Sequence, residues 1–136
     1  MHIVYLSIGS NLGNREENLR RAVRMIGQRA GRVTSQSSVY KSQAWGFESV
    51  HRFANIAIKI ETGLSPLDLL HTTQQIELDM GRTGKTVNGQ YQDRIIDIDI
   101  LLYDKQQVNL PELRIPHPLM QLRDFVMIPL QEILEK

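Results

Sequence analysis

The sequence has no cysteine, a single tryptophan and only 6% aromatic residues, and these scarcities exclude several classes of protein. Without cysteine there are no disulfides, thiolate metal sites or cysteine nucleophiles, which fits a cytoplasmic protein. No apolar run approaches the roughly 20 residues of a membrane span, so we expect no membrane partner and no signal peptide. A net charge of +1 argues against a nucleic-acid partner.

What the sequence does contain is the composition of an ordinary globular domain. Of its 136 residues, 41% are hydrophobic and 23% are charged, which is enough for one sizeable core under a polar surface. We therefore expect residues 1–136 to form a single domain, and we expect that domain to act as a monomer.

An acidic pair lies within an otherwise apolar stretch, residues 93–103 (DRIIDIDILLY), which predicts a β-strand. Strand side chains alternate between faces, so Asp97 and Asp99 share one face about 7 Å apart. The opposite face is expected to enter a core through Ile96, Ile98, Ile100 and Leu102. Two neighbouring carboxylates repel each other, and a divalent cation such as Mg²⁺ relieves that repulsion. The alternative is an edge strand whose acids are solvated and only deter aggregation.

Periodicity and capping signals predict the order strand, helix, strand, strand, helix, strand. The strands are expected at 2–8, 32–40, 53–61 and 93–103, and a short closing helix at 125–133. Asn14 and Ser65 are predicted to be helix N-caps, and Gly31 and Gly81 are predicted to end the two helices. This order predicts an α+β sandwich with a ferredoxin-like βαββαβ core, an antiparallel sheet and both main helices on one face. The last strand is expected to lie centrally, beside the first.

Two further clusters of residues point toward a ligand. Phe53 and Asn55 share the outer face of their strand, where a ring and an amide suit a flat heterocycle. The alternative for this pair is ordinary cross-strand packing with a capping amide. Residues 81–94 form a long loop with three glycines, in which Arg82 and Arg94 are available to phosphates or are simply solvated.

Several motifs together resemble the 6-hydroxymethyl-7,8-dihydropterin pyrophosphokinase family of folate biosynthesis, and the resemblance covers nearly the whole chain. They are residues 6–13 (LSIGSNLG), 53–55 (FAN), 74–77 (QQIE), 81–82 (GR), 93–101 (DRIIDIDIL), 115–118 (IPHP) and 123–125 (RDF). The resemblance implies an ATP-dependent diphosphokinase that transfers pyrophosphate from ATP to the pterin hydroxymethyl group and releases AMP.

The resemblance also implies roles for individual residues. Asp97 and Asp99 would hold two Mg²⁺ ions and, with Arg82 and Arg94, form the catalytic set. The pterin would be bound by Ser42, Gln43, Trp45, Phe53, Asn55 and Phe125. ATP, the co-substrate, would be bound by Gln74, Glu77, Arg82, Arg94, Ile100, His117 and Arg123. The loop 81–94 would act as a mobile lid.

One segment departs from the family pattern. In the lid, Gly84 stands where a second arginine is usual, and residues 88–94 (NGQYQDR) replace an Arg-Trp-Gly-Pro-Arg sequence. Two other functions stay open at this stage. A non-catalytic ligand-binding module on the same fold would not need the acidic pair, and a metal-dependent nuclease should be more basic.

Overall fold

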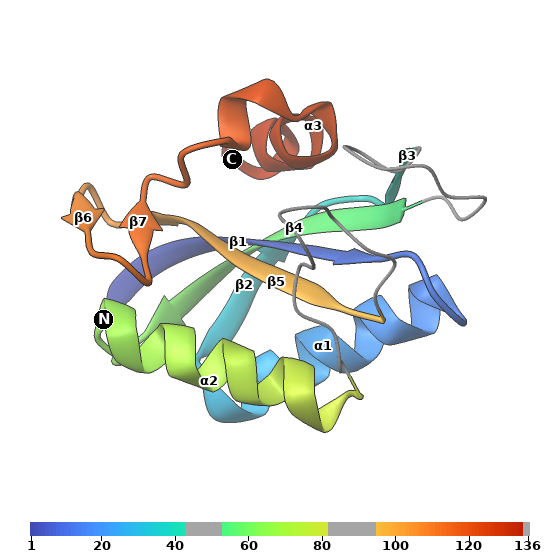
Figure 1. Ribbon diagram of the computed structural model, residues 1–136, viewed down its shortest axis with the longest axis horizontal. Helices are drawn as coiled ribbons and strands as arrows, with labels where there is room; N and C mark the ends of the chain where they lie inside the picture. Colours follow the sequence, from blue (N-terminus) through green and yellow to red (C-terminus); the bar gives the residue numbers. More distant parts are fainter. Residues whose placement is uncertain (43–52, 82–94, 135–136) are drawn as a thin grey trace.

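The computed structural model describes residues 1–42, 53–81 and 95–134, which form a sheet with helices on both faces. Figure 1 shows α1 (Arg15–Arg29) and α2 (Pro66–Asp79) on one face of the sheet and α3 (Asp124–Leu134) on the other. Four predicted site residues lie outside the described residues, as does the predicted loop beyond Gly81. They are Gln43, Trp45, Arg82 and Arg94.

The sheet is antiparallel throughout, with the strand order β2-β4-β1-β5 and β3 paired to β4. This confirms the predicted ferredoxin-like α+β class. The strands are β1 (His2–Ser10), β2 (Arg32–Gln36), β3 (Tyr40–Ser42), β4 (Phe53–Thr62) and β5 (Asp97–Tyr103). A two-stranded hairpin, β6 (Val108–Asn109) with β7 (Arg114–Ile115), follows β5.

The prediction that the last strand lies centrally is wrong. Among the described strands, β5 pairs with β1 alone and so lies at the edge of the sheet, while β1 lies between β4 and β5. Two backbone groups on the outer edge of β5 bond to other parts of the chain. The Ile98 N–H donates to the Glu77 carboxylate, and the His117 N–H donates to the Leu101 carbonyl. These contacts protect an edge that would otherwise offer unpaired backbone groups.

The predicted strand 32–40 is interrupted, and β2 and β3 are separate. At the break, the Ser37 N–H donates to the Ala57 carbonyl, and the Ser37 hydroxyl accepts from the Ala57 N–H at 2.9 Å. A side-chain oxygen therefore takes the place of a backbone carbonyl, which ends the regular ladder.

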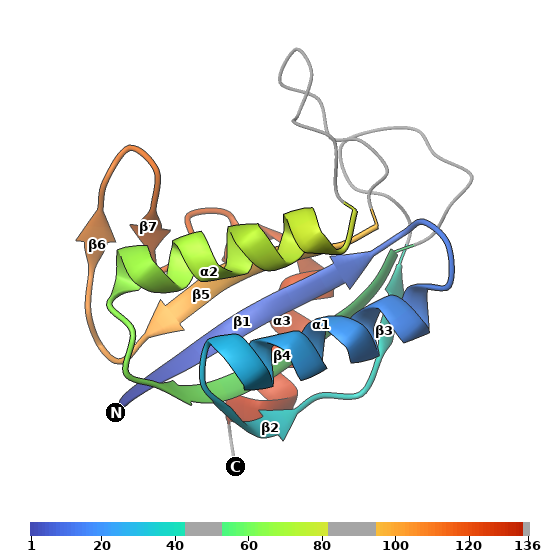
Figure 2. The same ribbon diagram turned by 90° about the horizontal axis from the view of Figure 1, so that it is seen from below.

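The predicted helix caps are confirmed. Asn14 accepts from the Glu17 N–H at 3.1 Å, and Ser65 accepts from the Asp68 N–H at 3.2 Å. Gly81 follows α2 with a φ of +96°, a conformation that favours glycine. Figure 2 shows α1 and α2 side by side across the strands. Neither they nor any other described helix has the length and apolar character needed to cross a membrane.

Each face of the sheet has its own apolar cluster. The larger lies between the sheet and the α1–α2 layer, and the smaller lies under α3. A register shift in the β1–β5 ladder, where Tyr5 pairs with Leu102 but Leu6 pairs with Ile100, corrects one prediction. Beyond this bulge the alternation reverses, so Leu102 packs under α3 and Tyr103 joins the larger cluster.

Candidate active site

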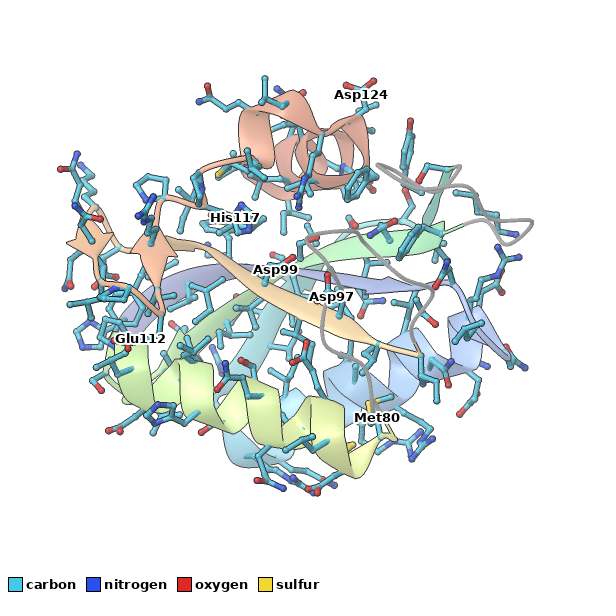
Figure 3. All side chains as sticks on the ribbon, viewed as in Figure 1. Met80, Asp97, Asp99, Glu112, His117 and Asp124 are labelled. Atoms are coloured by element: carbon cyan, nitrogen blue, oxygen red, sulfur yellow. The ribbon has the colours of Figure 1, made fainter. Side chains whose placement is uncertain are left out.

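The acidic pair lies at the start of β5, on the face that α3 partly covers. Asp97 and Asp99 are both partly exposed, whereas Ile98 between them is buried in the larger cluster. Figure 3 shows the two acids along β5, with His117 on the side toward α3. Glu77 on α2 is buried, and its Oε2 accepts from the Ile98 N–H at 2.7 Å. This bond fixes the backbone between the two acids.

A cleft of about 430 Å³ brings the acids together with most of the predicted nucleotide ligands. Its polar lining includes Gln74, Glu77, Asp97, Asp99, Glu112, His117 and Arg123. A second cavity of about 250 Å³ also has Asp99 and His117 in its wall, together with Ile100, which otherwise belongs to the core. Sequence reasoning missed Glu112, because no local pattern places the segment between β6 and β7 in the wall of the same cleft.

One ring nitrogen of His117 is occupied by a backbone hydrogen bond. Its Nδ1 accepts from the Leu119 N–H at 3.3 Å, which leaves Nε2 to carry the proton of the neutral ring. Nε2 lies 4.0 Å from Asp99 Oδ1. Burial lowers the pKa of His117, and the nearby Arg123 guanidinium lowers it further, while Asp97 acts in the opposite direction. The neutral ring therefore presents a hydrogen-bond donor toward the acids at neutral pH.

Two aromatic rings form a slot beside this cleft. Phe53 on β4 and Phe125 on α3 have ring centroids 6.4 Å apart and planes within 13° of parallel. A flat ring held between two aromatic planes needs about 7 Å, two layers of van der Waals contact, so the two rings would have to separate to admit one. The Arg123 guanidinium lies 5.7 Å from the Phe125 centroid and also lines the cleft. The slot and the cleft are therefore adjacent.

The slot has a polar side formed by Asn55 and Ser42. Asn55 is only 3% exposed, and across the described residues neither its Oδ1 nor the Ser42 hydroxyl has a hydrogen-bond partner. Gly9 pairs with Asn55 across the sheet, and a Cβ at Gly9 would lie 2.5 Å from Asn55 Nδ2. The missing side chain at Gly9 makes room for the Asn55 amide. This role was not readable from sequence, because it depends on the β1–β4 register.

The acidic pair supplies two of the oxygen ligands that a Mg²⁺ ion needs. In residues 1–42, 53–81 and 95–134, no three His, Asp or Glu side chains gather in a way that could hold a metal alone. Two carboxylates are nevertheless what Mg²⁺ takes from a protein when phosphates and water supply its other ligands. The residues present therefore fit an ion that is shared with a phosphorylated substrate.

The antiparallel α+β fold carries a cleft lined by two acids, a histidine and an arginine, an arrangement whose chemistry suits a phosphorylated ligand. The family model described as 7,8-dihydro-6-hydroxymethylpterin-pyrophosphokinase (HPPK) matches residues 5–135, and the chain belongs to this family.

Curated relatives agree with this assignment, and a solved structure supports the fold. A Porphyromonas gingivalis protein named 2-amino-4-hydroxy-6-hydroxymethyldihydropteridine pyrophosphokinase is 49% identical, over 98% of this chain and 91% of the relative. The Bacillus subtilis protein of the same name is 41% identical, over 99% of this chain and 80% of the relative. A crystal structure of Plasmodium falciparum HPPK-DHPS has a TM-score of 0.71 and 16% identity, covering 96% of this chain and 40% of that one, which supports the fold.

Proposed function

We infer that this protein transfers pyrophosphate from ATP to the hydroxymethyl group of 6-hydroxymethyl-7,8-dihydropterin, in folate biosynthesis. This is the activity for which its family and its curated relatives are named. The observation that carries the site assignment is the position of Arg123, which lines the cleft with both acids and also lies over the Phe125 ring. One side chain thus joins a region suited to phosphates to a slot suited to a flat ring.

In the proposed reaction, the pterin hydroxyl oxygen attacks the β-phosphorus of ATP in line. A bond forms between that oxygen and the β-phosphorus, the bond from the β-phosphorus to the α,β-bridging oxygen breaks, and the hydroxyl loses its proton. AMP leaves, and the pterin diphosphate is the second product. No protein nucleophile is required, because positioning and electrostatic stabilisation carry this class of chemistry.

We propose that Asp97 and Asp99 hold two Mg²⁺ ions. When bound, the ions would supply charge neutralisation on the triphosphate. Arg123 and neutral His117 would add donors to the phosphate oxygens, and Gln74 would add its side-chain amide. Glu77 would act through its bond to the Ile98 N–H, which keeps both acids turned toward the cleft. Arg82 and Arg94 remain proposed phosphate ligands.

We assign the pterin to the slot between Phe53 and Phe125. Stacking between two rings contributes about 0.5–1.5 kcal/mol per ring beyond area burial. Asn55 and Ser42 would pair with the polar edge of the pterin, together with Gln43 and Trp45. Phe53→Ala should weaken dihydropterin binding in calorimetry while the affinity for a non-hydrolysable ATP analogue stays unchanged. Loss of ATP affinity alone would reverse this assignment.

The reaction itself is tested by incubating the protein with ATP, Mg²⁺ and 6-hydroxymethyl-7,8-dihydropterin. AMP and pterin diphosphate are the expected products, and a control without pterin should form no AMP. ADP in place of AMP would indicate a simple kinase. Dihydropterin binding without AMP would indicate the alternative, a non-catalytic ligand-binding module.

We further propose that residues 1–136 act as one domain, as a monomer in the cytoplasm. A single continuous sheet carries both apolar clusters, which supports one cooperative unit. The lack of cysteine fits a reducing compartment. Light scattering during size-exclusion chromatography should give the mass of one chain, 15.6 kDa.

A further inference from the structure

A polar contact joins the far end of α3 to the break between β2 and β3. The Glu132 carboxylate accepts from the Ser38 N–H at 3.1 and 3.2 Å and from the Ser38 hydroxyl at 2.8 Å. Three donor–acceptor distances converge on one side chain, which fixes its direction. Neither residue lies in the cleft or in the slot described above.

The position of Glu132 on α3 relates it to the slot. Phe125 and Glu132 are seven residues apart, which is two helical turns, so they project from nearly the same side of the helix about 10 Å apart. The buried residues of α3 are Val126, Pro129, Leu130 and Ile133. Phe125 and Glu132 each directly precede one of these residues and therefore lie on the same edge of the buried stripe. A roll of α3 would displace both side chains together.

The position of Ser38 relates it to the opposite wall of the slot. Ser38 lies two residues before β3, and in the β3–β4 ladder Tyr40 pairs with Asn55 and Ser42 pairs with Phe53. The Glu132–Ser38 contact therefore connects the two walls of the slot. The connection runs from Phe125 along α3 to Glu132, and from there through Ser38 and β3 to Phe53 on β4.

Apolar packing alone leaves the roll of α3 weakly specified, because burial is not directional whereas hydrogen bonds are. The helix is also less constrained from within, since Pro129 has no N–H to donate to the Phe125 carbonyl one turn earlier. The Glu132–Ser38 contact, at the end opposite Phe125, adds such a directional constraint.

We propose that Glu132 is a positioning residue that holds the slot walls, Phe53 and Phe125, at their working separation by joining α3 to Ser38. The inference rests on the assignment of the pterin to this slot. It predicts that loss of the contact affects the pterin and spares the nucleotide. A residue with a merely structural role would reduce the amount of folded protein without separating the two ligands.

The test measures dihydropterin and non-hydrolysable ATP affinities by calorimetry, with KM and kcat, for Glu132→Ala, Glu132→Gln and Ser38→Ala. We expect Glu132→Ala to weaken dihydropterin binding about tenfold and leave ATP affinity within about twofold. Glu132→Gln keeps one acceptor oxygen and should restore most of the affinity. Ser38→Ala removes only the hydroxyl donor and should cost about threefold. Gln131→Ala, one position along the exposed side of α3, is the matched control and should bind like the wild type.

The outcomes separate this inference from the proposed function. If the wild-type protein binds dihydropterin and Glu132→Ala binds it equally well, the inference is overturned and the proposed function is not. Equal losses of pterin and ATP affinity also overturn it, because they indicate a structural role. A wild-type protein that binds no dihydropterin overturns both. If Glu132→Ala does not fold, the graded losses in Glu132→Gln and Ser38→Ala decide the question.

Discussion

The two faces of the sheet differ in what they bury. Against α1 and α2 the sheet presents a continuous apolar layer, in which Leu6, Ile58 and Ile100 are almost completely enclosed. Against α3 the apolar cluster is small, and it shares its face with Asp97, Asp99 and the buried amide of Asn55. One face therefore supplies most of the hydrophobic stabilisation, while the other carries repelling charges and polar atoms that a ligand would satisfy.

This difference shows how one sheet can stabilise the fold with one face and carry the candidate site on the other. Alternation along β5 directs Ile98 into the core and the flanking acids into the cleft. Because the packed Ile98 side chain holds its own backbone in place, it also holds the backbone of the two adjacent acids. Substitutions on the two faces should consequently separate stability from activity.

The largest expected effect follows from removing either acid of the cleft. Asp97→Ala or Asp99→Ala should lose several kcal/mol of transition-state stabilisation, about a thousandfold in turnover, because the phosphate charge is no longer balanced. Unfolding temperature without Mg²⁺ should hold or rise, since one of two like charges is gone. Asp79→Ala is the control. Asp79 pairs with Arg29 in the helix layer, so turnover should be unchanged. Near-normal turnover in both cleft variants would refute the metal assignment.

The opposite face should show the reverse pattern. Ile58→Ala removes a fully enclosed side chain from the larger cluster and should cost about 2–5 kcal/mol of unfolding free energy, measured by urea denaturation. The value of kcat per folded molecule should stay close to that of the wild type at a temperature where the variant is folded. A large fall in kcat at full folding would mean that the two faces are not separable.

A smaller effect is expected at the point where the core sheet meets the slot. Gly9→Ala places a Cβ against the Asn55 amide and should weaken dihydropterin binding about tenfold, with ATP affinity unchanged. It should also reduce discrimination against flat bicyclic analogues that lack the polar edge of the pterin. Gly63→Ala is the control, since the nearest atom outside its chain neighbours is Met1 Sδ at 3.7 Å. If Gly9→Ala binds the pterin as tightly as the wild type, Asn55 does not contribute to pterin binding in the slot.

The smallest effect lies at the end of β5 remote from the acids. The Ile3 N–H and the His2 ring lower the pKa of Asp104 below its usual range. Because the folded pKa is lower than the unfolded one, this contribution to stability is present above about pH 4 and disappears as the pH falls through the folded pKa. Asp104→Asn is the suitable variant, because asparagine also adopts the left-handed φ of 49° found here and keeps a side-chain oxygen that can accept from the Ile3 N–H. The stability difference between wild type and variant should therefore shrink below pH 4, and a constant difference would contradict this account.

Sequence alone determined the two main helices and the shared face of the acidic pair. Helix caps are local, so Asn14 and Ser65 were readable from their own neighbours. Strand alternation is equally local, which is why Asp97 and Asp99 were predicted to share a face. The family resemblance added the residues expected to bind ATP, and four of these, Gln74, Glu77, His117 and Arg123, line one cleft together with both acids.

Tertiary structure decided what depends on register and on contacts between distant segments. The bulge that sends Leu102 under α3 arises from the β1–β5 ladder, and the edge position of β5 follows from the strand order of the sheet. The space that Gly9 leaves for Asn55 and the contact between Ser38 and Glu132 join residues 46 and 94 positions apart. Side-chain periodicity has a range of a few residues, so no pattern in the chain encodes these pairings, and packing of the folded sheet alone selects them.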